Sequence, residues 1–278
     1  MPILNTYKVV NYNDPTNIYA HPDGVDDNNG SFHKPVRSIT RAMALVDATR
    51  LTVICAPGDY EEAATVTWPT RKGVRLIGSG ASVTTISAPT STTGIITVAP
   101  GVQASSFTGH LEGFEIVHDE VADIDGITFS NAAMTKKLGF NIKNCTFSPD
   151  SETDKSIHVE THSDSGNSIR IYVSGDGCQS EIGGAIYFNF NNNADRLHLE
   201  NCWIIGTITT SSTALEGRIR LFKCIVPHNG ATAGGNALQY ITAVDCFSWI
   251  DYDDLTPEIY AQLDSSELTG SHSEVIVD

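Results

Sequence analysis

The sequence is short of basic residues. Lys and Arg number 17 against 33 Asp and Glu, so the formal net charge of the 278 residues is −16. Because nucleic-acid affinity depends mainly on Lys and Arg contacts to phosphates, this balance argues against a nucleic-acid partner. The excess of acid is typical of a protein that stays soluble when it is crowded or highly concentrated.

Long apolar runs and cysteine pairs are also missing. No segment approaches the roughly 18 continuous apolar residues of a membrane helix. The N-terminal MPILNTYKVVNYNDP lacks the basic region and apolar run of a secretory signal. We therefore expect neither a membrane partner nor export. Six cysteines are too few for a disulfide scaffold and none lies in a CxxC pair, so we expect no zinc and no other cofactor.

Short β-strands dominate what is present. Between residues 50 and 250, runs rich in Ile, Val, Thr, Tyr and Phe alternate with clusters of Gly, Pro, Asn, Asp and Ser, and almost nothing has helical periodicity. The predicted strands lie in the runs 51–57, 73–80, 94–100, 111–118, 126–130, 138–147, 156–162, 169–175, 185–190, 197–206, 219–228 and 241–250. The pattern predicts an all-β protein.

Four of these runs carry a cysteine at an equivalent place. Cys202, Cys224 and Cys246 are 22 residues apart, and Cys145 precedes Cys202 by 57, which fits two longer turns. A repeat of this length predicts a coil in which each turn stacks on the previous one, about 4.8 Å away. The cysteines would then form an inward column, since cysteine is among the most buried residue types. Disulfides between turns and a reactive thiol stay open as alternatives.

The acidic loop DGVDDNNG, residues 23–30, poses a choice between a metal site and a cap. When Asn29 and Gly30 are aligned with an EF-hand calcium loop, valines occupy the first and last positions, where carboxylates are required. The next residues predict a short helix with Ser38 as its N-cap. The apolar face of that helix consists of Ile39, Ala42, Met43 and Val46. We therefore favour a cap that covers the exposed end of the coil.

The opening block resembles a known family. The segment IYAHPDGVDDNNGSFHKPVRSITRAMALV, followed by LTVICAPGDYEEAATVTWPTRKGVRLIGSG, has the order loop, KP-x-x-SI-x-x-A helix, PG-x-Y turn and GV-x-LIG-x-G strand. It resembles the start of right-handed parallel β-helix proteins of the pectate-lyase-like superfamily, well over residues 17–80 and loosely over the cysteine-marked turns. The resemblance implies a right-handed single-stranded parallel β-helix, a solenoid, but no particular reaction.

The chain then divides into three parts. An N-terminal arm with the capping loop and helix spans residues 1–50, the β-helix spans 51–250, and a C-terminal helix and tail span 251–278. In the last part, Thr256 before Pro257 predicts a short capping helix at about 257–264. The final SHSEVIVD predicts an arm that pairs with the strand edge of a neighbouring subunit.

No catalytic set is recognisable. Enzymes of the resembled superfamily use calcium-binding acids with a base, or clustered aspartates, and their motifs match only short fragments here. Acidic groupings lie at 118–125, 148–154 and 251–254, where a solvated turn is the favoured interpretation and a hydrolytic site the alternative. The other candidates are Arg170, Arg196, Arg218, Arg220, His118, His158, His162 and His198. Since none has the spacing of a metal or catalytic motif, we assign no catalytic, cofactor-binding or metal residue.

Two functions from different classes fit the sequence. The first is a non-enzymatic structural protein of a bacteriophage particle, such as a capsid decoration or cement subunit or a tail-associated β-helix. It would form a homotrimer, contact a major capsid or tail protein, and be located in the virion after assembly in the host cytoplasm. The alternative is a polysaccharide-binding or -cleaving β-helix, a tailspike-type depolymerase or lyase. For this alternative, the Asn-rich segment 189–201 with Tyr187 or Trp203 offers carbohydrate contacts, although a structural use of the asparagines is favoured. A surface adhesive protein is a third and weaker hypothesis.

Overall fold

The computed structural model describes residues 14–87, 94–101, 106–118, 124–130, 136–149, 154–160, 168–176, 180–190, 195–206, 208–212, 218–227, 231–233, 240–244 and 247–249. Several predictions fall outside the described residues: Cys246, His162, the acidic grouping 251–254, the helix at 257–264 and the C-terminal arm.

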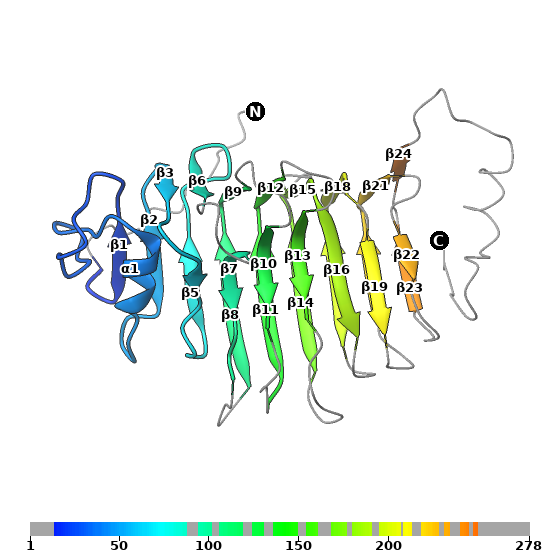
Figure 1. Ribbon diagram of the computed structural model, residues 1–278, viewed down its shortest axis with the longest axis horizontal. Helices are drawn as coiled ribbons and strands as arrows, with labels where there is room; N and C mark the ends of the chain where they lie inside the picture. The colour runs from blue at the N-terminus through cyan, green and yellow to red at the C-terminus, as the bar shows by residue number, and fades with distance from the viewer. Residues whose placement is uncertain are drawn as a thin grey trace, which may run out of the picture.

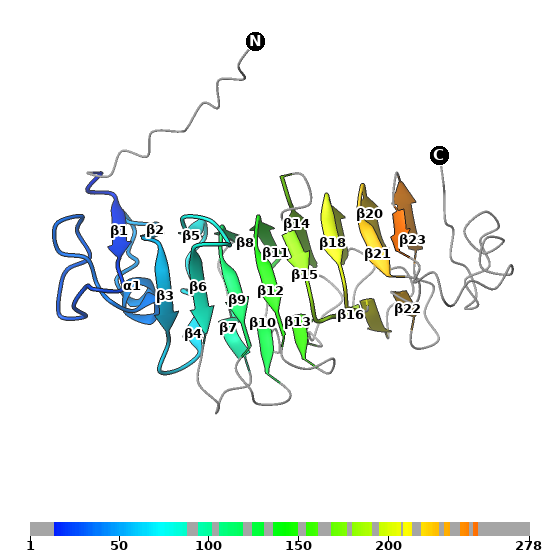
Figure 2. The same ribbon diagram turned by 90° about the horizontal axis from the view of Figure 1, so that it is seen from above.

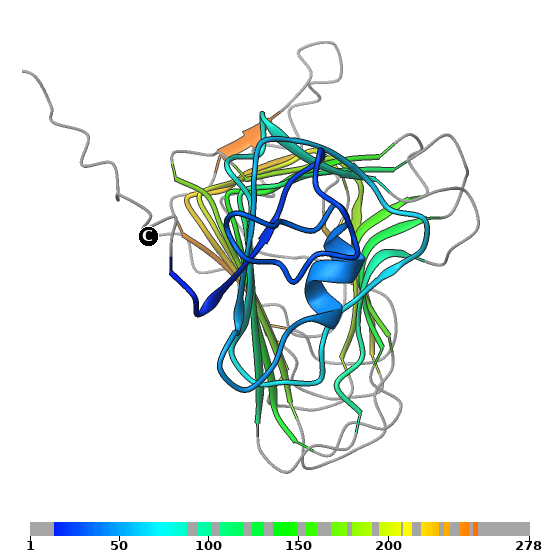
Figure 3. The ribbon, with the colours of Figure 1, turned by 90° about the vertical axis from the view of Figure 1, so that its left-hand side faces the viewer.

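The chain winds as a coil whose turns stack along the long axis of the molecule (Figure 1). Turn after turn adds one strand to each of three sheets, and the paired strands run parallel. The view from above shows the same succession of strands, and the view along the coil shows the sheets around a common interior (Figures 2 and 3). The predicted fold class, an all-β parallel β-helix, is confirmed.

The three sheets contain nine, eight and seven strands. The nine-stranded sheet has the order β1 (Asn17–Ala20), β2 (Thr52–Cys55), β5 (Val74–Ile77), β8 (Phe107–Glu112), β11 (Leu138–Lys143), β14 (Ile169–Ser174), β17 (Arg196–Glu200), β20 (Arg218–Phe222) and β23 (Tyr240–Val244). The eight-stranded sheet contains β3 (Gly58–Glu61), β6 (Thr84–Ser87), β9 (Glu115–Val117), β12 (Thr146–Ser148), β15 (Ser180–Ile182), β18 (Cys202–Ile204), β21 (Ile225–Pro227) and β24 (Phe247–Trp249). The seven-stranded sheet contains β4 (Val66–Thr67), β7 (Gly94–Val98), β10 (Asp125–Phe129), β13 (Lys155–Val159), β16 (Ala185–Phe190), β19 (Ile208–Ser212) and β22 (Ala231–Ala233).

In four turns, the corner between the nine-stranded and eight-stranded sheets is a tight bend built on one left-handed residue. The residues with positive φ at this corner are Gly113 (76°), Asn144 (50°), Asn201 (52°) and Lys223 (52°). Gly and Asn adopt this conformation at little cost, whereas a lysine is destabilised there because its Cβ lies too close to the following carbonyl oxygen. The residue that follows each bend points inward and is fully buried: Phe114, Cys145, Cys202 and Cys224.

The predicted cysteine column is confirmed for its described members. Strand register places Cys145, Cys202 and Cys224 in one column, in which position 180 of β15 stands on the single turn between the first two. Their thiols donate to backbone carbonyls rather than forming disulfides; Cys202 Sγ, for example, lies 3.6 Å from Val173 O and 3.3 Å from Glu200 O. Burial raises the pKa of Cys145 to about 12, which disfavours a reactive thiol there.

The interior holds a cluster of aromatic rings where β8 passes β11. Phe140 meets Trp68 edge to face at 4.8 Å and Phe129 at 5.1 Å between ring centroids. Gly109 is the register partner of Phe140, and a Cβ at Gly109 would lie only 2.4 Å from the Phe140 ring. The missing side chain at residue 109 therefore makes room for this ring.

The N-terminal end of the coil is closed by a loop and by helix α1 (Ile39–Ala44), which lies across the opening in Figure 3. The chain at 30–36 runs along the outer edge of β1, where Tyr19 N donates to Gly30 O, and Val36 N donates to Tyr19 O. Ile39, Ala42 and Met43 of the helix are buried in the core. An otherwise open strand edge is thus satisfied.

Two carboxylates hold the start of the helix. The predicted N-cap Ser38 accepts from Arg41 N. Asp26, from the acidic loop, accepts from Arg37 N, Ser38 N and Ser38 Oγ at 2.8 to 3.0 Å. Glu62, only 2% exposed, accepts from the Ile39 and Thr40 amides. These acids satisfy amides that a helix start leaves without partners.

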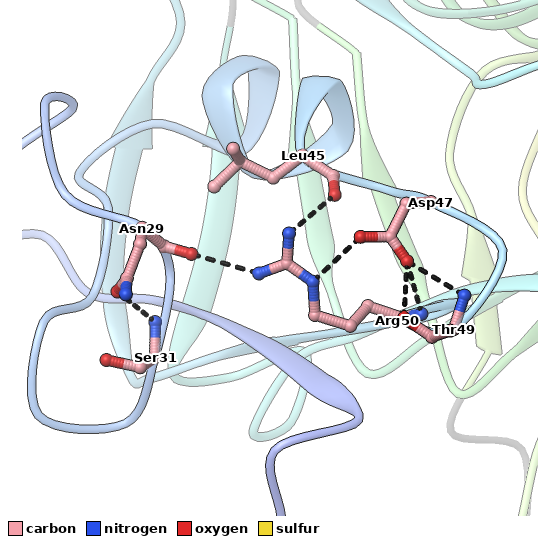
Figure 4. A network of polar contacts seen from close by, with 6 residues as sticks. All are labelled: Asn29, Ser31, Leu45, Asp47, Thr49 and Arg50. Carbon is pink, nitrogen blue, oxygen red and sulfur yellow. Dashed lines mark hydrogen bonds and ion pairs between the residues drawn. The ribbon is translucent and has the colours of Figure 1, made fainter.

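Arg50 fixes the other end of the capping segment (Figure 4). Its guanidinium donates to the carbonyls of Asn29 and Leu45 and to the Asp47 carboxylate. Asp47 also accepts from the hydroxyl and amide of Thr49, and these hydrogen bonds hold the pKa of Asp47 far below its usual value. The loop, the helix end and the start of β2 are thereby tied together.

Three details differ from the sequence interpretation. The coil begins with β1, before the helix, rather than with the run at 51–57. The PG-x-Y motif contributes strand β3 rather than a turn. The runs 111–118, 138–147, 197–206, 219–228 and 241–250 each hold parts of two strands rather than one; in the first, Gly113 turns the chain between them. In the part of the chain that the structure describes, no helix has the length and apolar character to cross a membrane.

Candidate functional site

The outer face of the nine-stranded sheet carries a column of three arginines. Arg170 on β14 is the register partner of Arg196 on β17, which is in turn the partner of Arg218 on β20. Arg170 and Arg218 are exposed and Arg196 is partly buried. Successive rungs of a sheet lie about 4.8 Å apart, so three like charges stand at successive rungs.

A second column beside it is aromatic and basic. Tyr172, His198 and Arg220 are register partners on the same three strands. The Tyr172 and His198 rings stack, with centroids 4.6 Å apart and an interplanar angle of 23°. Partial burial, with the Arg220 charge adding to it, lowers the pKa of His198, so this imidazole is neutral near pH 7. The Glu200 carboxylate accepts a hydrogen bond from the Tyr172 hydroxyl and so holds the tyrosine in place.

We call Arg170, Tyr172, Arg196, His198, Arg218 and Arg220 the basic face. Four of the nine arginines of a chain with net charge −16 stand on these three neighbouring strands. Rows of planar guanidinium groups suit repeated carboxylates, because each guanidinium can bind a carboxylate through two parallel hydrogen bonds.

A second polar group, the histidine cluster, lies on the seven-stranded sheet. Asp125 begins β10 and binds His158 of β13, with its Oδ2 2.5 Å from His158 Nδ1. The Lys155 ammonium lies 3.6 Å from the other oxygen of Asp125, and Thr128 donates its hydroxyl to the carboxylate. The Tyr187 ring meets His158 edge to face. A carboxylate bonded to Nδ1 orients the imidazole and leaves Nε2 to accept a proton.

Behind this group lies a buried pair, His118 and Asp154. Both side chains are 0% exposed, and His118 Nδ1 is 3.5 Å from Asp154 Oδ2. Neither ring nitrogen of His118 has a hydrogen bond of good geometry. Burial lowers the pKa of His118, against the opposing pull of Asp154 and Asp125, so the ring is neutral at pH 7.

The structure brings together residues that the sequence left scattered. The four predicted arginine candidates share the basic face, and His198 joins them. Asp125 and Asp154, from two of the acidic groupings, are buried beside histidines. The interpretation of these two aspartates as parts of solvated turns is therefore wrong.

The two aromatic alternatives for a carbohydrate contact lie on different sheets. Tyr187 lies on β16 of the seven-stranded sheet and Trp203 on β18 of the eight-stranded sheet. Asn201 serves as the left-handed corner residue. Sequence reasoning missed Lys155 and Tyr172. The pairing of Arg196 with Arg218 had a usable signal, because these two residues are 22 apart, the same repeat as the cysteines.

Within the described ranges, no group of three or more His, Cys, Asp and Glu has the arrangement of a metal site. In the acidic loop, the Asp26 carboxylate is occupied by the two amides and the hydroxyl at the start of α1. Glu62, the residue that follows β3, likewise accepts hydrogen bonds from helix amides. These carboxylates act in the cap.

Fold and site together define a parallel β-helix protein with a charged, aromatic sheet face. Residues 23–245 match the family model described as "Protein of unknown function (DUF1565)", and the chain belongs to this family. A search of the curated proteins gives no match. Among solved structures, the chain is similar to pectin methylesterase from carrot, with 12% identity, a TM-score of 0.43, and coverage of 94% of this chain and 88% of that one.

Proposed function

We propose that this protein is a non-enzymatic structural subunit of a bacteriophage particle, in the capsid shell or the tail, and that its basic face binds an acidic polysaccharide. The observation that carries the binding role is the column of Arg170, Arg196 and Arg218 on a chain that is otherwise strongly acidic. A straight row of guanidinium groups suits an extended chain of uronate or similar sugars, because both present charges at regular steps. The stacked Tyr172 and His198 rings add an apolar surface for a sugar ring.

The particle role is supported by the way the coil is built. Its interior is filled with apolar side chains from the capping helix onward, which makes a rigid block. Cys55, Cys145, Cys202 and Cys224 are buried thiols, as expected of a protein assembled in a reducing cytoplasm. The acidic remainder of the chain favours solubility at high copy number. In this proposal the subunit is a homotrimer in the virion, in contact with a major capsid or tail protein.

The test uses the purified full-length chain. Light scattering gives the mass in solution, and co-sedimentation with particles lacking this protein tests docking on the shell or tail. A trimer that sediments with the particles supports the role. A monomer that stays in the supernatant contradicts the particle assignment.

Polysaccharide binding is tested separately with alginate as an acidic polymer and dextran as a neutral one. We expect binding to alginate alone, and we expect it to weaken in the double variant Arg196→Gln/Arg218→Gln. The matched control is Arg71→Gln, because Arg71 is exposed on a loop and does not belong to the basic face. Equal affinity of the double variant and the control would remove the basic face from the proposal.

A second candidate function, cleavage of the polysaccharide, is favoured by the histidine cluster. His158 held by Asp125 is arranged as a proton acceptor, with the Lys155 charge beside it. Incubation with alginate followed by measurement of polymer length tests this. Shortening that disappears in His158→Gln would favour an enzyme over a structural subunit, and an unchanged length would exclude cleavage of this polymer.

A further inference from the structure

The basic face contains one side chain whose charge can change near neutral pH. Arginine side chains stay protonated in folded proteins, whereas the unperturbed pKa of histidine lies in the physiological range. His198 is the histidine among the six residues of the basic face. It is therefore the residue of this face through which pH can act on a bound ligand.

The His198 ring is held in place on the outer side of the sheet. It stacks on Tyr172, with ring centroids 4.6 Å apart. Its Nε2 lies 3.8 Å from Glu200 Oε2, which is longer than a hydrogen bond, and Glu200 accepts from the Tyr172 hydroxyl. The His198 side chain is 26% exposed. The ring can thus meet a ligand at the surface without leaving the stack.

The neighbouring strands bring positive charge to His198. Burial and the charge of Arg220, its register partner on β20, lower the pKa of His198, so the ring is neutral near pH 7. Asp195 is fully buried and accepts from the Ile169 amide. Arg196 and Arg218 interact within the chain, and the effect of Arg220 on His198 does not require either to be unpaired. The charged and titratable groups of the segments packed here are Arg170, Tyr172, Asp195, Arg196, Glu200, Arg218 and Arg220.

We propose, on the basis of the binding role proposed above, that His198 makes anion binding at the basic face pH-dependent. In this proposal the neutral ring takes up a proton when a carboxylate or sulfate group binds beside it. The bound anion and the imidazolium then stabilise each other. Binding of an acidic polymer becomes tighter in mild acid and weaker near neutral pH.

The direction of this effect follows from linkage. A bound anion offsets the repulsion by Arg220, so the pKa of His198 is higher in the complex than in the free protein. Each unit of that rise makes the protonated protein bind the anion about tenfold more tightly. An opposite charge at close range shifts a pKa by about 1–3 units, and we expect about one unit for a ring that is partly exposed. Because the pKa of free His198 lies below 6.5, the affinity rises as pH falls from about 7 towards 5.

The first measurement is the pKa of His198 in the full-length protein, from NMR signals of the imidazole protons against pH. Sulfate is the probe because it keeps its charge over this range, and chloride at equal ionic strength is the reference. The signal is assigned by its loss in His198→Gln. We expect sulfate to raise the pKa of His198 by about one unit. The signal of His33, which is exposed in the capping loop, should respond alike to both salts.

Two variants test the neighbours of the ring. In Arg220→Gln the pKa of His198 in chloride should be higher than in wild type, because the repulsion is gone, and sulfate should raise it less. His110→Gln is the matched control. His110 lies on β8 of the same sheet and pairs with Glu112 at 2.9 Å, so its removal should leave the response of His198 to sulfate unchanged.

Alginate then tests the coupling on the proposed ligand. Wild type should bind alginate about tenfold more tightly at about pH 5 than at about pH 7, and His110→Gln should keep this ratio. In His198→Gln the ratio should be severalfold smaller. Part of it should remain, because the whole protein becomes less negative in acid.

The outcomes distinguish the pH coupling from the binding role itself. The same His198 pKa in sulfate and in chloride overturns the coupling, and so does an alginate affinity ratio that is equal in wild type and His198→Gln. A pKa that rises in sulfate while alginate binds at neither pH supports the coupling and contradicts the polysaccharide ligand. Equal alginate binding at both pH values with no effect of sulfate supports the binding role and overturns the coupling.

Discussion

A double-mutant cycle at Gly109 and Phe140 tests the packing of the coil interior. Gly109→Ala adds one methyl group that would lie 2.4 Å and 2.6 Å from two carbons of the Phe140 ring and 3.2 Å from Trp68 Nε1. The φ of Gly109 is not in the left-handed region, so the backbone accepts alanine and the cost arises from the clash alone. Overpacking of this kind costs about 1–3 kcal/mol.

The second mutation of the cycle removes the Phe140 ring. Phe140→Ala empties a site that is 1% exposed and should cost about 3–5 kcal/mol. In that background the new methyl group of Gly109→Ala enters vacated space, and the loss of glycine's flexibility in the unfolded chain contributes about 0.4–1 kcal/mol of stability. The cost of Gly109→Ala should therefore fall to zero or change sign, a coupling of about 2 kcal/mol.

Urea unfolding followed by circular dichroism gives the four free energies. The matched control is Gly139→Ala on β11, where the added Cβ would meet nothing closer than 3.8 Å, so it should be neutral or slightly stabilising. If Gly109→Ala costs the same with and without the Phe140 ring, the two residues do not share one space. The described packing of the aromatic cluster would then be wrong.

Three further changes have defined expected outcomes. The free energy of unfolding should fall as pH drops from about 7 towards 5, because burial lowers the pKa of His118 and the folded state therefore binds fewer protons below pH 6.5 than the unfolded chain does. Urea unfolding midpoints measured against pH check this. The dependence of the midpoint on pH should become weaker in His118→Gln. Cys202→Ser should cost about 1–3 kcal/mol in thermal unfolding, because it replaces a fully buried thiol by a smaller and more polar hydroxyl, while polysaccharide binding stays unchanged; a loss of binding with stability intact would contradict the structural role. Lys223→Gly should raise stability by about 1 kcal/mol in urea unfolding because it relieves a left-handed lysine, and a destabilised variant would refute the corner geometry.

Much of the coil could be predicted from the sequence because its signals are local and repeated. The alternation of apolar residues in runs such as IRIYVSG reports which side chains point inward, and the 22-residue spacing of the cysteines reports the length of a turn. Ser38 with the apolar face of residues 39–43 gave the helix and its cap, as the structure has it.

Strands without a strong apolar pattern were missed. β6, β15 and β19 contain Thr, Ser and Glu at most positions and are strands because they pair on both sides in the coil. Strand β1 was missed because the four residues NIYA are too few to show a period, and its position depends on pairing with β2, 35 residues further along.

The candidate site depends on register, which the sequence reveals only in part. The arginines stand together because Arg170, Arg196 and Arg218 are register partners, and the first spacing, 26 residues, differs from the second, 22. The burial of Asp125 and Asp154 could not be predicted, since acids in a Gly- and Ser-rich turn are usually solvated. Their burial follows from the histidines that the neighbouring turns place beside them.

The most direct test of the central claim is the salt dependence of alginate binding by the full-length protein. The affinity should fall as salt rises, and the slope of its logarithm should shrink by roughly 1 for each arginine removed, first in Arg196→Gln and then in Arg196→Gln/Arg218→Gln. The polymer should keep its full length throughout. A slope that is the same in wild type and in both variants would contradict the claim that the basic face is the binding site.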